Sequence, residues 1–259
     1  MKKIVRRLLS LCAFAPLLVG QAFAWGQTGH RAVGLVAEHH LKKKVQKKVA
    51  KVLHDNSMAE VSTWMDDIKS DAAYNHTHDW HWVTIPDNTK YEDTQKNPNG
   101  DLVMKLEEVV AALKAKNLSP EKEEEYLKIL IHLIGDLHQP LHVGGKDDTG
   151  GNAVRLQWFG QSSNLHRVWD SDMIDSKQLS YHELAIFVGE PTKEEQKAWQ
   201  AGTVKDWAYG MMPLRPQVYN IPEDKKLSYR YLYQNFDTVE KCILQAGVRL
   251  AGLLNEIYG

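Results

Sequence analysis

Two histidine–aspartate pairs at helical spacing place the strongest constraint on how this chain folds. His132 and Asp136 lie four residues apart in the segment HLIGDLHQPLH, and a third candidate, His142, follows beyond a proline. His166 and Asp170 repeat the spacing in NLHRVWD. Side chains four residues apart share one face of a helix. A single pair of this kind is usually a surface hydrogen bond. Two pairs with a further histidine instead predict a metal site, because zinc accepts imidazole nitrogen and carboxylate oxygen.

Apolar residues recur at helical spacing along most of the chain, which predicts a mainly α fold, a single-domain multi-helix bundle. Ser119, followed by Pro120 and Glu121, is a strong helix-start signal, and this helix is expected to run through Leu137. The alternating stretch 152–159 predicts a short strand or one arm of a β-hairpin. The other helices are expected at 28–41 (with Thr28 as its cap), 42–54, 101–116, 192–207 and 229–258, and a connecting loop at 211–222.

The first 24 residues have the pattern of an export signal. Four basic residues precede an apolar run over 8–19, and Ala22-Phe23-Ala24 is a small-x-small cleavage site. Cleavage after Ala24 would leave residues 25–259 as the functional domain, exported to the periplasm or secreted. No later run approaches the roughly 20 apolar residues that a membrane helix needs. Cys242 would then be the single cysteine, and we expect it to be a buried thiol.

The charge balance excludes a broadly basic, nucleic-acid-binding surface. The chain has 32 Lys and Arg residues against 33 Asp and Glu residues. Four of the basic residues belong to the signal, so 28 face 33 and the net charge after cleavage is −5 with neutral histidine. The lysines between 42 and 51 are interpreted as a solvated helix face. Positive charge for an anionic substrate must then come from a local source such as bound metal.

The motifs occur in a specific order: WGQTGH from Trp25, TWMDDIK, the pair His81-Trp82, HLIGDLHQPLH, GGN ending at Asn152, and NLHRVWD. In this combination the chain resembles the zinc-dependent single-strand nucleases of the S1/P1 type. The resemblance spans Trp25 to about Asp172 and implies three zinc ions in a cleft between helices.

The same resemblance implies a ligand set for each ion. One ion would be held by Asp66, His81, His132 and Asp136. A second would be held by His142, His166 and Asp170. A third would be held by His30, Asp136, and the amine and carbonyl of Trp25. An N-terminal amine can be a ligand only when no residue precedes it, so cleavage after Ala24 would complete the site.

The resemblance also implies that four positions take part in catalysis or substrate binding. Asp136 would bridge two ions, and Lys69 would neutralise charge on the phosphoryl oxygens; the alternative for Lys69 is an exposed helix lysine. Trp82 would stack on a nucleobase, which favours single strands, or would pack in the core. Asn152 would bind a base edge, or would simply be a turn residue.

One position departs from the family pattern. Many members have an acidic residue three positions after the equivalent of His81, and this chain has Thr84 there. A hydroxyl cannot act as a general base near neutral pH, so either the metals alone activate water or another carboxylate, such as Asp87, assists. His76 and His78 lie close to His81 in sequence and are candidates to support the ligands.

Together these features predict a zinc-dependent phosphodiesterase. It would cleave single-stranded DNA and RNA to 5′-mononucleotides and hydrolyse 3′-nucleotides, acting as a monomer without a stable protein partner. A zinc-dependent phospholipase C is the alternative enzyme, because its metal cluster and N-terminal tryptophan are alike. A non-enzymatic zinc-binding protein is the third possibility, and the complete ligand set argues against it.

Overall fold

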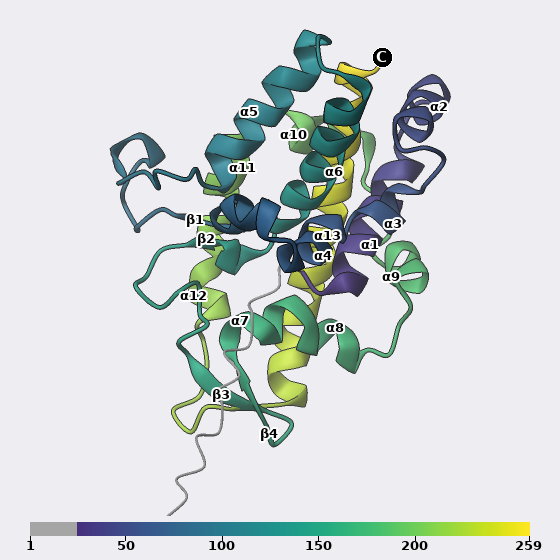
Figure 1. The fold of residues 1–259 in the computed structure, drawn as a ribbon. Coiled ribbons are helices and arrows are strands. Elements are labelled where there is room, and N and C mark those ends of the chain that lie inside the picture. Colours follow the sequence, from purple (N-terminus) through teal and green to yellow (C-terminus); the bar gives the residue numbers. More distant parts are fainter. Residues whose placement is uncertain (1–24) are drawn as a thin grey trace, which may run out of the picture.

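Helix α6 (Pro120–Leu137) begins and ends where the sequence predicts, and it runs through the middle of the protein (Figure 1). The Ser119 hydroxyl accepts a hydrogen bond from the Lys122 amide, and Pro120 occupies the first helical turn, where its missing N–H costs nothing. Residues 129–137 are all buried. A helix that is buried all round must be covered on every side, and α6 packs against helices from both ends of the chain.

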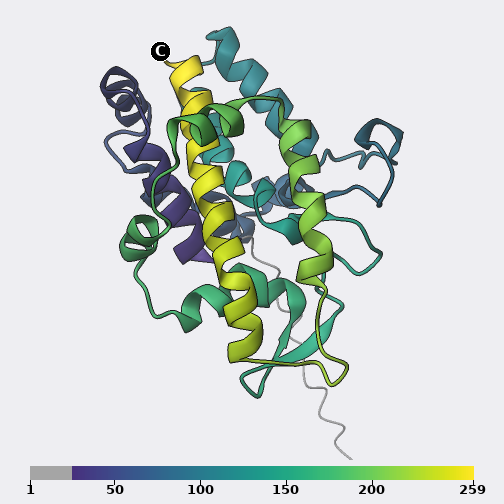
Figure 2. The same ribbon diagram turned by 180° about the vertical axis from the view of Figure 1, so that it is seen from behind.

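This computed structural model describes residues 25–259, so the predicted signal, residues 1–24, lies outside the described part. Helix α1 (Gln27–His39) and helix α13 (Tyr229–Ile257) make the most extensive helix pairing. A Cβ atom at Gly247 would lie 2.4 Å from Val36 Cγ1, so only glycine lets the two helices approach this closely. Figure 2 shows α13, in yellow, between α1 in purple and the light green segment around residue 210.

The other helices of residues 25–259 surround these three. They are α2 (Lys43–Val52), α3 (Met58–Val61), α4 (Trp64–Asp67), α5 (Leu102–Ala115), α7 (Leu165–Arg167), α8 (Met173–Ser176), α9 (Tyr181–Phe187), α10 (Lys193–Gln200), α11 (Val204–Met211) and α12 (Arg215–Val218). Tighter 3₁₀ segments are η1 (Ile68–Ser70), η2 (Ala72–His81), η3 (Tyr91–Asp93), η4 (Pro140–His142) and η6 (Met212–Leu214), and η5 (Val168–Asp172) is a π turn. The predicted mainly α fold is confirmed.

Three local predictions were wrong in detail. Helix α1 begins one residue before Thr28, and Gly26 is its N-cap, because the Gly26 carbonyl accepts from the amides of the first turn. The stretch 192–207 is two helices, since Gly202 has φ +88° and Thr203 starts α11 with a capping box. The expected loop 211–222 contains α12.

Strands are short and form two small sheets. Strand β1 (Val83–Thr84) pairs in parallel with β2 (Val143–Gly144). The predicted hairpin is present as β3 (Arg155–Trp158) and β4 (Gln161–Asn164), and β5 (Lys226–Leu227) adds to β3 in parallel. The first pair matters for the site, because His81 and His142 each lie one or two residues before one of its strands.

Two remaining expectations concern single features. Cys242 is buried, as predicted, and burial raises the pKa of its thiol to about 12. Among residues 25–259, none of the helices combines the length and the apolar character that crossing a membrane requires.

Candidate metal centre

The C-terminal end of α6 is the point where the predicted ligand side chains meet. His132 and Asp136 project from one face of α6, and the other side chains arrive from α1, α4, the end of η2, η4, and the α7–η5 segment. These side chains are each at most 6% exposed: His30, Asp66, His81, His132, Asp136, His142, His166 and Asp170. Histidine and aspartate are rarely this buried without partners or a metal.

One group of side chains surrounds Asp136. His81 Nδ1 lies 2.9 Å and His132 Nε2 lies 3.4 Å from Asp136 Oδ2. His30 Nε2 lies 3.3 Å from the other oxygen, Oδ1. Asp66 Oδ1 lies 3.9 Å from His132 Nε2. Both oxygens of Asp136 therefore face imidazole nitrogens from different elements, which is the arrangement expected of a bridging carboxylate.

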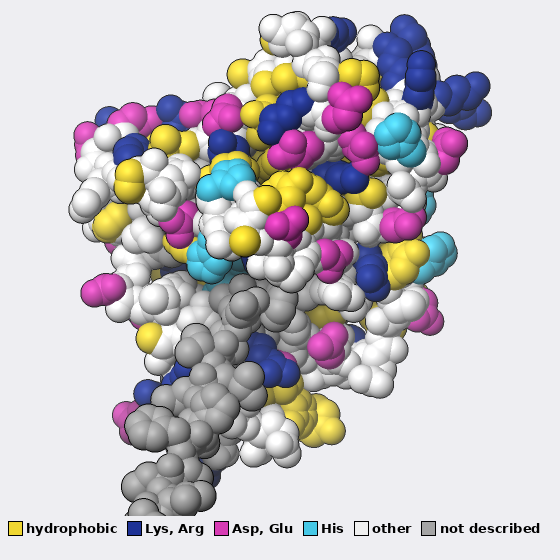
Figure 3. Space-filling view, viewed as in Figure 1, with side chains coloured by type: hydrophobic (Ala, Val, Ile, Leu, Met, Phe, Trp, Pro, Cys, Tyr) yellow, Lys and Arg dark blue, Asp and Glu magenta, His cyan; other side chains and the backbone are white. Residues whose placement is uncertain are grey.

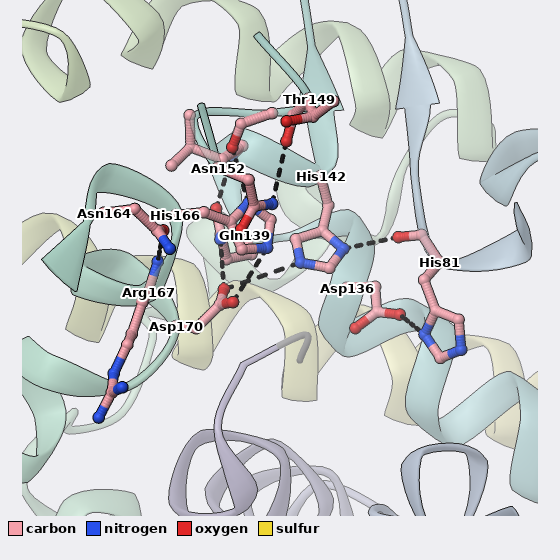
Figure 4. A network of polar contacts seen from close by, with 12 residues as sticks. His81, Asp136, Gln139, His142, Thr149, Asn152, Asn164, His166, Arg167 and Asp170 are labelled. Atoms are coloured by element: carbon pink, nitrogen blue, oxygen red, sulfur yellow. Dashed lines mark hydrogen bonds and ion pairs between the residues drawn. The ribbon is translucent and has the colours of Figure 1, made fainter. Parts of the chain in front are cut away.

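A second group surrounds Asp170 (Figure 4). His166 Nε2 lies 3.0 Å from Asp170 Oδ2, and His142 Nε2 lies 3.7 Å from Oδ1. The ligand atoms of these three residues all lie within 4.8 Å of one another, and the same is true of the sets His81–His132–Asp136 and His30–Asp66–His132. The set His142–His166–Asp170 is the one that the family resemblance implies for one ion, whereas the set His30–Asp66–His132 combines residues that the resemblance implies for two different ions.

Backbone carbonyls fix the orientation of three of these imidazole rings. The Nδ1 atoms of His132, His142 and His166 donate to the carbonyl oxygens of Ser62, His81 and Gly150 at 2.7, 2.6 and 2.7 Å. Each ring is therefore held as the tautomer that carries hydrogen on Nδ1. The lone pair on Nε2 then points toward the aspartates, as is usual for histidines that bind metal.

Several buried atoms of the cluster have no hydrogen-bond partner among the described residues. They are the Nε2 atoms of His81, His142 and His166, both ring nitrogens of His30, and Asp136 Oδ1. Buried polar atoms nearly always have partners, and the close His–Asp contacts of these atoms lack hydrogen-bond geometry. Imidazole nitrogen and carboxylate oxygen are the donors that zinc prefers. The residues present therefore fit a metal site.

The pKa values show which groups of the cluster are already in the form that binds metal near neutral pH and which must first lose a proton. Burial lowers the pKa of His81 to about 4, so this ring is neutral. Burial also opposes a charge on His142, but Asp136 and Asp170 outweigh it and raise the pKa to about 9. Burial alone would raise the pKa of Asp136, yet the neighbouring imidazoles hold it well below its usual range. The carboxylate is thus ionised, and binding a metal would release a proton from His142.

Trp25 is fully buried next to the first group. A Cβ atom at Gly135 would lie 2.8 Å from His30 Nδ1 and 3.8 Å from Trp25 Cδ1. Because Gly135 has no side chain, α6 accommodates both Trp25 and His30 one residue before Asp136. The following amide, Gly26 N–H, donates to the Asp170 carbonyl at 2.7 Å, so the start of the domain is attached to both groups of candidate ligands.

The residues expected to touch substrate lie around the cluster. Lys69 Nζ is 2.6 Å from Asp66 Oδ1. Trp82 is 37% exposed, next to the buried His81, and its ring packs edge-on against His78 at 5.2 Å. The alternative of core packing for Trp82 therefore fits less well. The Asn152 side chain donates to the Thr149 carbonyl at 3.0 Å, which is the contact of a turn residue.

The structure also bears on the position where the family pattern is broken. Thr84 is exposed at the end of β1. The Asp87 carboxylate is 2.8 Å from Arg215 Nη1, so it is engaged in an ion pair and is a poor general base. His76 Nδ1 binds the Ala73 carbonyl and His78 pairs with Asp79, which places both outside the ligand cluster.

Sequence reasoning missed two residues that hold the ligands. Gln139 is fully buried and donates to Asp170 Oδ1 at 2.5 Å. Arg215 is 5% exposed and donates to the carbonyls of Val143 and Gly144, directly after His142. The position of Gln139 between two candidate ligands, in DLHQPLH, was an available signal. Nothing in the local sequence marks Arg215.

Comparison with known proteins decides the family. The profile described as S1/P1 Nuclease matches residues 25–259, the whole described chain. The chain belongs to the S1/P1 nuclease family. It is therefore a hydrolase that acts on ester bonds, as the sequence motifs predicted.

Individual relatives agree with this assignment. The chain is 31% identical to Endonuclease 4 of Arabidopsis thaliana over 93% of its own length and 91% of the relative's. It is 27% identical to Nuclease P1 of Penicillium citrinum, covering 91% of this chain and 98% of that protein. It is 29% identical to Nuclease S1 of Aspergillus oryzae over 68% of this chain and 63% of that protein.

Proposed function

We propose that this member of the S1/P1 nuclease family is an exported, zinc-dependent enzyme that cleaves single-stranded DNA and RNA to 5′-mononucleotides and also hydrolyses 3′-nucleotides. The observation that carries the proposal is that the Nε2 atoms of His30, His142 and His166 are buried without a hydrogen-bond partner while lying 3.3, 3.7 and 3.0 Å from aspartate oxygens. That arrangement is costly in the protein alone and is satisfied by divalent metal. Relatives named as nucleases support the choice of substrate.

Three zinc ions are proposed to occupy the cluster. The ligand sets are those that the family resemblance implies: Asp66, His81, His132 and Asp136; His142, His166 and Asp170; and His30, Asp136 and the terminal amine and carbonyl of Trp25. Bound zinc would supply Lewis acidity toward phosphoryl oxygen and would activate water near neutral pH. The positive charge of the ions would also hold a phosphate in an otherwise acidic protein.

The remaining roles belong to side chains of the chain itself. Lys69, held by Asp66, would approach the phosphoryl oxygens and neutralise the charge that develops on them. The exposed face of Trp82 would stack on an unpaired base. Bases in a duplex are already stacked on each other, so this contact would favour single strands.

Digestion of single-stranded DNA and RNA by the processed protein tests the proposal. We expect 5′-mononucleotides to be released, the activity to be lost with a chelator, and zinc to restore it. His142→Ala should abolish activity, whereas His182→Ala, at an exposed histidine of α9, should not. Hydrolysis of phospholipid faster than nucleic acid would overturn the proposal in favour of a phospholipase C.

A further inference from the structure

Helix α2 presents a face that consists almost entirely of lysine. Its apolar positions, Val45 and Val49, are buried, and Val52 is half-buried. The exposed positions are Lys42, at the N-cap, and Lys43, Lys44, Gln46, Lys47, Lys48 and Lys51. Lys and Arg side chains gather visibly over this helix at the upper right of the molecule (Figure 3). Six of the 28 basic residues after position 24 thus lie within ten consecutive positions.

These lysines lack acidic partners in the described chain. Lysines on α5 and α6 are paired: Lys105 Nζ is 2.6 Å from Glu108 and Lys128 Nζ is 2.5 Å from Glu124. Among residues 25–259, no carboxylate lies within 4.0 Å of an α2 lysine. The Lys48 ammonium does make a hydrogen bond, but to a neutral group, the Tyr258 carbonyl, at 2.7 Å. The charge of α2 is therefore not neutralised by the protein.

The arrangement is unfavourable for the helix by itself. Lys43 and Lys47, and Lys47 and Lys51, are four residues apart, where like charges repel. The first turn holds no acidic residue, so its lysines also oppose the helix dipole. Packing through Val45 and Val49 holds the helix in place despite this repulsion. A polyanion bound along the exposed face would remove it.

We propose that the lysine face of α2 is a second contact surface for the polynucleotide substrate, separate from the metal centre. The inference rests on the proposed nuclease function and extends it to the way long strands bind. A phosphate chain is favoured over a lipid surface because α2 exposes no large apolar side chain to enter a bilayer. The rest of the processed chain is acidic, so this face is the local attraction for phosphates.

The offset along α6 between the end of α2 and the metal centre makes the surface selective for length. His54, just after α2, pairs with Glu124 in the first turns of α6 at 3.2 Å. The candidate ligand His132 lies eight residues further along α6, which is about 12 Å of helix. A mononucleotide at the metal centre does not bridge this gap, whereas a strand of several nucleotides does.

The test replaces four lysines, in the variant K43Q/K44Q/K47Q/K51Q, and leaves Lys48 because it holds the chain end. A matched control, K193Q/K197Q/K225Q/K226Q, removes the same charge from exposed lysines elsewhere. KM is measured for a 3′-mononucleotide and for a single strand much longer than a site of about 4–16 nucleotides. Binding of a phosphorothioate strand is measured separately by fluorescence anisotropy.

At low salt, we expect the KM of the α2 variant for the long strand to be at least about fivefold higher than that of the parent protein. The slope of log binding constant against log salt concentration should become shallower by up to about 3, or about 0.7 for each lost phosphate contact. KM for the mononucleotide and the control variant should not change. The inference would be overturned if the α2 variant and the parent protein had equal KM values for the long strand. It would also be overturned if the variant raised KM equally for the long strand and the mononucleotide. Loss of binding to anionic vesicles with strand binding intact would overturn it as well. If the unaltered protein binds the strand through α2 but cleaves nothing, the proposed function fails and the binding surface stands.

Discussion

The Gln139 side chain donates to Asp170 Oδ1 at 2.5 Å while its own oxygen accepts from the Leu141 amide at 2.5 Å. This buried contact holds one oxygen of Asp170, so the carboxylate keeps a single orientation toward His142 and His166. Gln139→Ala removes the donor. We expect zinc affinity to fall about 10- to 100-fold, as when other groups that orient metal ligands are removed. Competition with a chromogenic chelator measures the change.

The matched control for this prediction is Gln161→Ala, at an exposed amide in the hairpin. It should leave zinc affinity unchanged. If Gln139→Ala and the parent protein bind zinc equally well, Asp170 does not need this hydrogen bond to keep its orientation.

Arg215 connects β2, which follows His142, to Asp87, three residues after the end of β1. Its guanidinium donates to the carbonyls of Val143 and Gly144 and contacts Asp87 at 2.8 Å. Arg215→Met leaves buried carbonyls without donors, so the free energy of unfolding should fall by about 2–4 kcal/mol. Asp87→Asn removes only an exposed partner and should cost less than about 1 kcal/mol. Urea unfolding distinguishes them, and equal losses would show that the ion pair, not the carbonyl contacts, provides the stability.

The buried His138 and the partly buried Arg249 form a contact that makes stability depend on pH. His138 Nδ1 donates to the Ile134 carbonyl, and its Nε2 accepts from Arg249 Nη1, both at 2.7 Å. Burial and then the nearby guanidinium hold the pKa of His138 well below 6.5. Above pH 6.5 the ring is neutral in both the folded and unfolded states. Below it the unfolded chain binds a proton that the folded chain does not, so stability is lost as pH falls.

The metal-free protein should therefore lose up to about 1.4 kcal/mol per pH unit through His138 as pH falls below 6.5. His138→Gln keeps a donor and an acceptor but does not titrate, so the variant should lose this component of the slope. Unfolding free energies at several pH values, in parent and variant, measure the difference. Parallel curves would contradict the prediction.

Trp82 is the exposed aromatic residue beside the cluster, and stacking on a base is worth about 1–3 kcal/mol. Trp82→Ala should raise KM for single-stranded DNA by about 5- to 150-fold. Phe159→Ala is the control, because Phe159 is equally exposed at 37% but lies at the turn between β3 and β4. An unchanged KM in Trp82→Ala would return this residue to a packing role.

The sequence was sufficient for features that depend on local spacing. The four-residue separation of His132 and Asp136 put both on one face of α6, and Ser119 with Pro120 marked its start. The predicted hairpin arm followed from alternation over 152–159. These features are set by neighbours within a few residues, so a single sequence reveals them.

The missed features depend on contacts between distant parts of the chain. Arg215 binds a carbonyl 72 residues away, and Gln139 binds a carboxylate 31 residues away. Gly26 rather than Thr28 caps α1, and its amide is held 144 residues away in sequence by the carbonyl of Asp170. No local propensity encodes such pairings, and they become visible only when the helices are packed.

If the chain is processed as we propose, Trp25 is the residue through which cleavage would affect metal binding. Its side chain is buried against α6 beside His30, so the start of the domain already lies at the cluster. A free α-amino group has a pKa of only about 8 and is easily deprotonated by a metal, whereas an amide nitrogen is a poor ligand. A protein that starts at Trp25 should therefore bind about three zinc ions per chain, as the proposed ligand sets require. A protein with one alanine before Trp25 should bind fewer and be less active, while an alanine added after Gly259 should have no effect. Metal analysis of the three forms measures this, and full zinc content and activity with the extra N-terminal residue would show that the terminal amine is not a ligand.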